Sequence, residues 1–159
     1  MLQGAETTTS TLGDAIAMLH PLLVHFPIAL IITAVPAEFL RLRRGSDAAS
    51  PTARFLVMVG ALGALLAGVT GWIKAAVDGG GYDGRDLGWH KWSGVAFTVI
   101  AVVLACIAPR AEQAPGRLKA FRLVLVAAAA ILLIVGHYGA TLAGHTLDFS
   151  LFTKALSGG

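Results

Sequence analysis

The chain has 159 residues, of which 56% are hydrophobic and only 13% are charged. Soluble domains carry about twice that share of charged residues, so the composition excludes a disordered chain and argues against a water-soluble globule. The net charge of +3 arises from scarce charges and not from a basic patch, which argues against nucleic-acid binding. The sequence therefore predicts a small integral membrane protein, in which five histidines stand out.

A single cysteine, Cys106, limits the redox chemistry. It cannot form an intramolecular disulfide, and no Cys-x-x-Cys-His segment is present for covalent attachment of a c-type haem. Zinc sites built from thiolates and iron–sulfur clusters need several cysteines, so both are excluded.

Four stretches without Asp, Glu, Lys or Arg are long enough to cross a bilayer, which takes about 20 apolar residues. In chain order they are Ala15–Ala37, Phe55–Ile73, Trp92–Pro109 and Leu123–Leu147. Short connections favour antiparallel neighbours, so we expect an all-α protein, an up-down four-helix transmembrane bundle. Its domain is expected over residues 15–145, between outer tails 1–14 and 146–159.

Lysine and arginine in the connections predict the orientation, because cytoplasmic loops are enriched in them. The first and third connections hold eight of the 12 basic residues, and the opposite side holds four. The first and third connections are therefore expected in the cytoplasm, with both termini outside. In a Gram-negative bacterium this corresponds to a multi-pass protein of the inner membrane.

Small residues recur at i, i+4 spacing in the second stretch, as Gly60-Ala64-Gly68 and Gly63-Ala67-Gly71. Such spacing permits close approach of membrane helices, and we favour this interpretation. The alternative is a smooth surface beside a flat cofactor.

All five histidines fall toward the outer side of the expected bundle. His20 and His25 lie in the first turns of the first stretch, His90 at the outer mouth of the third, and His137 and His145 near the outer end of the fourth. From the helical rise, His25 and His137 are expected at similar depth inside the bundle. Ionisable groups inside a membrane are rare and usually functional, whereas His20 and His145 suit a wet helix end equally well.

Imidazole is the commonest metal ligand, and these stretches offer no carboxylate beside the histidines for a di-iron site. A bis-histidine haem b needs only two imidazoles on different helices and an apolar slot. We expect one or two haems b, with His25 and His137 as the first axial pair and His90 and His20 as alternatives or as a second pair. Small residues around His137 suit a macrocycle: Gly136, Gly139, Ala140 and Gly144.

Basic and aromatic residues gather at the outer rim of the expected bundle: Lys74, Arg85, Lys91, Trp89 and Trp92. Arg85 and Lys91 are candidates to hold haem propionates. The same residues suit interface anchors equally well.

Three segments resemble motifs of the DUF2231 family of bacterial four-helix membrane proteins. They are the segment from His20 to Leu30 (HPLLVHFPIAL), the segment from His90 to Gly94 (HKWSG) and the segment from Gly136 to Leu142 (GHYGATL), in which Ala140 replaces an expected glycine. Relatives resembling this chain occur beside, or fused to, c-type cytochrome or Rieske domains. The resemblance implies association with electron-transfer proteins. It supports His20, His25, His90 and His137 as one set of functional residues, without naming a reaction.

The leading hypothesis is a membrane electron-transfer subunit that binds haem b and exchanges electrons with a periplasmic cytochrome-type partner or with quinol. Since ligands gather at one face only, the chain is not expected to carry electrons across the membrane by itself, nor to be an enzyme on its own. The alternative is a non-redox anchor or assembly subunit of a larger membrane complex. A metal-dependent or proton-relay enzyme is the weakest hypothesis, because no carboxylate lies beside the histidines.

Overall fold

The computed structural model describes residues 3–78 and 84–144, and these residues form helices and turns without a β-strand. The elements in chain order are α1 (Gln3–Leu23), α2 (His25–Arg43), α3 (Pro51–Val77), α4 (Gly84–Ile107), the 3₁₀ helix η1 (Ala108–Gln113) and α5 (Pro115–Leu142). Four spans in the described residues are long and apolar enough to cross a membrane: Leu12–Arg43, Pro51–Val77, Gly84–Gln113 and Pro115–Leu142. The expected number of spans is confirmed.

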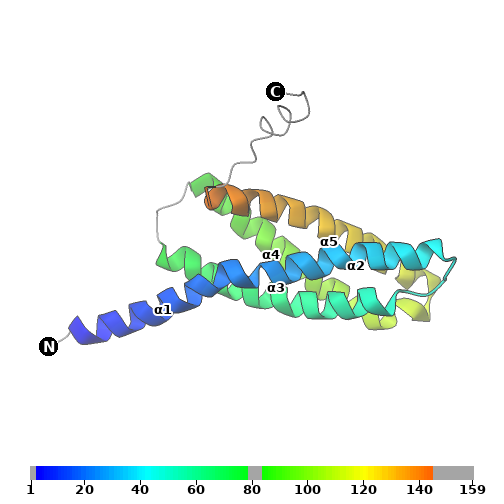
Figure 1. Ribbon diagram of the computed structural model, residues 1–159, viewed down its shortest axis with the longest axis horizontal. Coiled ribbons are helices and arrows are strands. Elements are labelled where there is room, and N and C mark those ends of the chain that lie inside the picture. Colours follow the sequence, from blue (N-terminus) through cyan, green and yellow to red (C-terminus); the bar gives the residue numbers. More distant parts are fainter. Residues whose placement is uncertain (1–2, 79–83, 145–159) are drawn as a thin grey trace, which may run out of the picture.

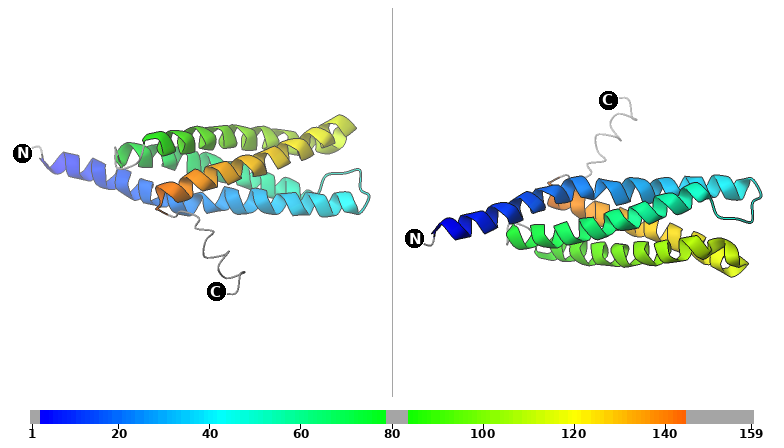
Figure 2. Two further views of the ribbon diagram at one scale, coloured as in Figure 1. Left: turned by 90° about the horizontal axis from the view of Figure 1, so that it is seen from above. Right: turned by 90° about the horizontal axis from the view of Figure 1, so that it is seen from below.

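The spans run up and down beside one another as a bundle, with α1 and α2 forming one long span (Figure 1). We call the end that carries Val77 and Leu142 the histidine end, and the end that carries Arg43 and Pro115 the arginine end. The first turns of α1 project beyond the bundle at the histidine end, as all the views show (Figures 1 and 2). Residues 3–14, expected as part of an outer tail, therefore begin this helix. The expected tail 146–159 lies outside the described residues.

The first span breaks between α1 and α2, at Val24. Pro27 has no backbone N–H, so the carbonyl of Leu23 lacks its usual helical donor. On either side of this position the ladder continues, since Val24 donates to the carbonyl of His20 at 3.1 Å and Ile28 donates to that of Val24 at 3.4 Å. The break lies between the two histidines of the first motif.

The small residues of α3 let the first span approach closely, as expected. A Cβ atom on Gly60 would lie 3.2 Å from Cδ1 of Ile31, and one on Gly63 would lie 3.1 Å from Cδ of Pro27. Both contacts join α3 to α2. Helix packing is thus the role of these two glycines, as our preferred interpretation held.

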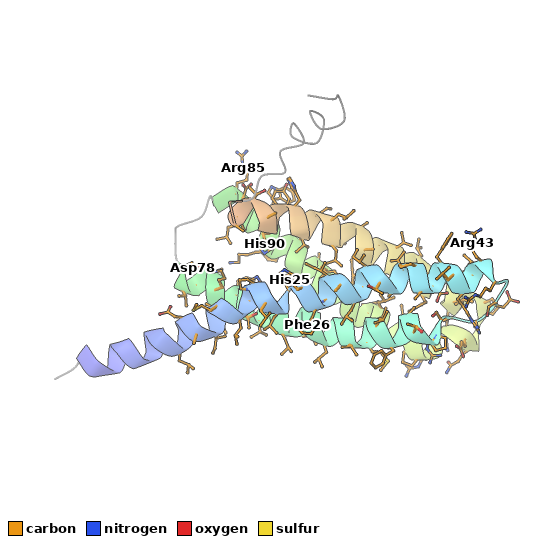
Figure 3. All side chains as sticks on the ribbon, in the orientation of Figure 1. His25, Phe26, Arg43, Asp78, Arg85 and His90 are labelled. Carbon is orange, nitrogen blue, oxygen red and sulfur yellow. The ribbon has the colours of Figure 1, made fainter. Side chains whose placement is uncertain are left out.

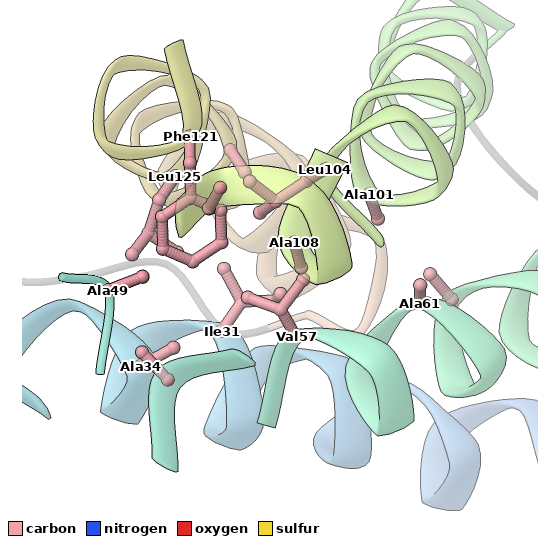
Figure 4. Close-up of a cluster of buried hydrophobic side chains, with 14 of the residues drawn as sticks. Ile31, Ala34, Ala49, Val57, Ala61, Ala101, Leu104, Ala108, Phe121 and Leu125 are labelled. Carbon is pink, nitrogen blue, oxygen red and sulfur yellow. The ribbon is translucent and has the colours of Figure 1, made fainter. Parts of the chain in front are cut away.

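The buried apolar cluster lies mainly in the half of the bundle nearer the arginine end and combines alanines with a few large side chains (Figure 4). The largest fully buried side chains come from all four spans: Phe121, Ile31, Leu104, Leu125 and Val57. Because every span contributes, the core fixes the spans relative to one another at this end. Toward the histidine end, α3 buries Ala64, Ala67 and Thr70.

A buried carboxylate closes the arginine end. Glu38 is 4% exposed, and its Oε1 accepts from Nε of Arg122 at 2.7 Å. Its Oε2 accepts from the backbone N–H of Ser50 at 2.7 Å, and the hydroxyl of Ser50 in turn accepts from the N–H of Ala53 to cap α3. One acidic side chain on α2 thus ties together the starts of α3 and α5.

Candidate functional site

Three segments bring histidines to one end of the bundle. Figure 3 shows His25 and His90 toward the end that also carries Asp78 and Arg85, opposite Arg43. This one-sided arrangement agrees with the sequence prediction. His145, the fifth histidine, lies outside the described residues.

His20 of α1 and His90 of α4 face each other across the bundle. Their ring centroids lie 6.3 Å apart, with an angle of 75° between the ring planes. Two imidazoles that bind one metal ion from opposite sides, each through a bond of about 2.0–2.1 Å, have centroids about 6 Å apart once the ring radius is added. The centroid spacing therefore matches that of two ligands of a shared metal ion, and the T-shaped arrangement is also that of two rings in direct edge contact.

Backbone carbonyls orient both rings. Nδ1 of His20 lies 3.0 Å from the carbonyl oxygen of Ala67, and Nδ1 of His90 lies 3.2 Å from that of Val135. A carbonyl oxygen only accepts, so each Nδ1 carries the proton and each Nε2 keeps a free lone pair. Histidines that bind metals typically use their second nitrogen in this way, which fixes the tautomer and the ring orientation.

Two glycines make room for the two rings. A Cβ atom on Gly71 would lie 2.8 Å from Cε1 of His20, and one on Gly139 would lie 3.1 Å from Cε1 of His90. Any larger residue would displace the ring beside it. Sequence reasoning placed Gly71 in a packing motif and Gly139 beside His137, and missed the histidine that each accommodates. The sequence did contain an indication of this role, because each glycine is predicted at the same end of the bundle as a histidine of another span.

The expectation that His25 lies inside the bundle is wrong. Its side chain is exposed on α2, and its Nδ1 donates to the carbonyl of Pro21, one turn earlier in the same span. Five residues separate His20 from His25, which is about 140° around a helix with 3.6 residues per turn. When His20 faces α3 and α4, His25 must point elsewhere.

His137 is also exposed, so the expected interior pair of His25 and His137 is not formed. The His137 ring contacts Tyr138 edge to face, with centroids 5.3 Å apart. Tyr138 stacks in turn on Trp89 of α4, with centroids 6.0 Å apart and 11° between the rings. These three side chains, with Leu133 and Ile134, line an open groove of about 460 Å³ on the outside of α4 and α5.

The basic residues of the rim have partners within the protein. Nζ of Lys91 lies over the ring of Trp72, 4.0 Å from its centroid. Lys74 pairs with Asp78 at 2.6 Å, and Arg85 is also engaged in an interaction. Lys91 therefore has the contact expected of an interface anchor, and a role for Lys91 or Arg85 beside propionates stays a prediction.

A small cavity of about 70 Å³ adjoins the His20–His90 pair and extends toward the middle of the bundle. Its lining is apolar apart from the two rings and includes small residues of α3 and α4: Ala64, Ala67, Gly68 and Gly94. Ligand pockets usually measure about 300–1,000 Å³, so a macrocycle between the rings would extend beyond this cavity. Within residues 3–78 and 84–144, no group of three or more metal-ligating side chains occurs, so a metal there would have two protein ligands.

The fold and the site define an all-helical membrane protein with four apolar spans and a pair of facing histidines at one end. The chain belongs to the DUF2231 family of predicted membrane proteins, whose model matches residues 17–146. The match covers both members of the histidine pair. No curated protein and no solved structure matches the chain.

Proposed function

We propose that this protein is a membrane electron-transfer subunit that holds one haem b between His20 and His90. The observation that carries the proposal is the pair itself: two imidazoles from different spans, 6.3 Å apart between centroids, each with Nδ1 held by a carbonyl. His20 and His90 would hold the haem in place of His25 and His137, because the latter two are exposed. Haem supplies reversible one-electron transfer when bound.

The chain's own residues orient the ligands. The carbonyls of Ala67 and Val135 fix the two rings, and apolar side chains line the cavity beside them. With ligands at one end only, we propose exchange with a periplasmic cytochrome-type protein or with quinol at that end. The inner membrane, with the histidine end toward the periplasm, is the location that the basic residues of the arginine end favour.

A reduced-minus-oxidised absorption spectrum of the purified protein tests the proposal. We expect a b-type band that disappears in His20→Ala and in His90→Ala. His25→Ala and His137→Ala are matched controls, since both change exposed histidines of the same end, and the band should persist in both. Absence of the band from the unmodified protein, with iron supplied, would overturn the proposal, as would its survival in both His20→Ala and His90→Ala.

A non-redox assembly subunit is the second candidate, and the same hydrogen bonds favour it. His20 joins α1 to α3 and His90 joins α4 to α5 through carbonyl contacts that need no cofactor. The variants His20→Gln and His90→Gln keep an N–H donor but lose the imidazole ligand. If Gln restores stability that Ala removes while no pigment accompanies the unmodified protein, the histidines act as interhelical links.

A further inference from the structure

We propose that the groove lined by Trp89, Leu133, Ile134, His137 and Tyr138 binds the headgroup of a membrane quinol or quinone. The inference rests on the proposed redox function and names the lipid-soluble carrier and its site. The groove measures about 460 Å³ and is shallow and open along its outer side, so it would cover one face of a flat ligand and leave the other face toward the lipid. It lies on the outer surface of α4 and α5, where a ligand dissolved in the bilayer can enter.

Two polar side chains line the groove, His137 and Tyr138. Among the residues that the structure describes, neither the ring of His137 nor the hydroxyl of Tyr138 forms a hydrogen bond. They lie five and four residues before the end of α5 at Leu142, about 6–8 Å along the helix. In a 28-residue helix, about 42 Å long against a hydrocarbon core of about 30 Å, these positions lie near the membrane surface, and their polar groups have no partner among the described residues. A quinol hydroxyl or quinone carbonyl supplies one, whereas an acyl chain does not.

The order of residues along α5 matches an amphipathic ligand with a flat head. His137 and Tyr138 lie nearer the helix end, and Leu133 and Ile134 lie about one turn deeper. The stacked rings of Trp89 and Tyr138, 11° apart, form an aromatic wall at the head position. A quinone ring can lie beside this wall while its apolar tail follows Leu133, which is 71% exposed.

On both α4 and α5, a residue that lines the groove directly precedes a residue of the His90 site. Trp89 precedes His90, whose ring is bound to Val135 of α5. Tyr138 precedes Gly139, the residue that makes room for the same ring. The two helix segments that hold His90 on one side thus form the groove on the other. This adjacency is the second reason to choose a redox-active ligand over an ordinary lipid.

Quenching of Trp89 fluorescence by a decyl-substituted benzoquinone tests the groove. The reporter is the double variant Trp72→Phe with Trp92→Phe, which leaves Trp89 as the fluorescent tryptophan. We expect saturable quenching that His137→Ala and Tyr138→Phe each weaken by about 3- to 10-fold in affinity, the range for loss of one hydrogen bond. His25→Ala, which changes an exposed histidine of another span, should leave the affinity unchanged.

The outcomes separate the groove from the haem. Saturable quenching in a preparation without a b-type band supports the quinone groove. It contradicts only the proposal that the protein binds haem. A b-type band together with quenching that never saturates contradicts only the quinone groove. The same conclusion follows if a decyl chain without a quinone ring quenches equally well. Equal affinity in the His137→Ala, Tyr138→Phe and reporter proteins also overturns it.

Discussion

A Cβ atom on Gly71 of α3 would lie 2.8 Å from Cε1 of His20 on α1, closer than real Cβ atoms approach other atoms. The glycine therefore sets the position of the ring, and the ring sets the distance to His90. We expect Gly71→Ala to displace His20 from the carbonyl of Ala67 and to lower the free energy of unfolding by about 1–3 kcal/mol, the usual cost of overpacking. Titration of unfolding with sodium dodecyl sulfate in micelles measures this change.

Gly139→Ala and Gly136→Ala form a matched pair on α5. The Cβ of the first would lie 3.1 Å from Cε1 of His90, whereas that of the second would meet nothing within 4 Å. We expect a smaller loss of stability for Gly139→Ala than for Gly71→Ala, and none for Gly136→Ala. Identical unfolding curves for the two α5 variants would contradict the spacer role.

Removal of the Glu38 carboxylate should destabilise the arginine end strongly. Glu38→Ala leaves Arg122 without its ion pair and the N–H of Ser50 without its acceptor. We expect the free energy of unfolding to fall by about 3–5 kcal/mol, as for other buried pairs that lose one partner. The double variant Glu38→Leu with Arg122→Met should recover part of the loss.

The exposed pair of Arg54 and Glu112 provides the control for this prediction. Their atoms lie 2.9 Å apart, but the side chains are 28% and 45% exposed. Exposed ion pairs contribute about 0–1 kcal/mol, so Glu112→Ala should have little effect. If Glu38→Ala were as mild as Glu112→Ala, the buried pair would not hold the arginine end together.

Lys91 and Trp72 should be energetically coupled. The ammonium group lies 4.0 Å from the ring centroid, and such contacts contribute about 0.5–2 kcal/mol. In a double-mutant cycle of Lys91→Met and Trp72→Leu, we expect the second change to cost less once the first is present. Strictly additive effects on the unfolding midpoint would show that the two side chains act separately.

Cysteine labelling tests the orientation in the membrane. In a Cys106→Ser background, Asp47→Cys places a thiol in the exposed loop of the arginine end, and Gly84→Cys places one at the histidine end. A membrane-impermeant maleimide added to spheroplasts should label the Gly84→Cys protein and leave the Asp47→Cys protein unlabelled, because the arginine end is expected inside. Labelling of the Asp47→Cys protein before lysis would reverse the assigned orientation.

Sequence reasoning predicted the spans and the grouping of the histidines at one end, and both are observed along the described chain. Long apolar runs suffice to count the spans, because only a helix satisfies its backbone within a single segment in lipid. Depth follows from rise per residue, so the histidine end was also predictable. Glu38 pairs with Arg122, which lies 84 residues further along the chain, so the sequence alone could not assign this pair.

The sequence by itself therefore determined the class, the number of spans and the end at which the histidines gather. The tertiary structure alone decided which histidines meet. Rotation of each helix about its axis depends on packing, and the contacts of Ile31 and Pro27 with the glycines of α3 set that rotation for the first span. They turn His20 toward His90 and leave His25 exposed, because two residues five apart cannot share one face of a helix.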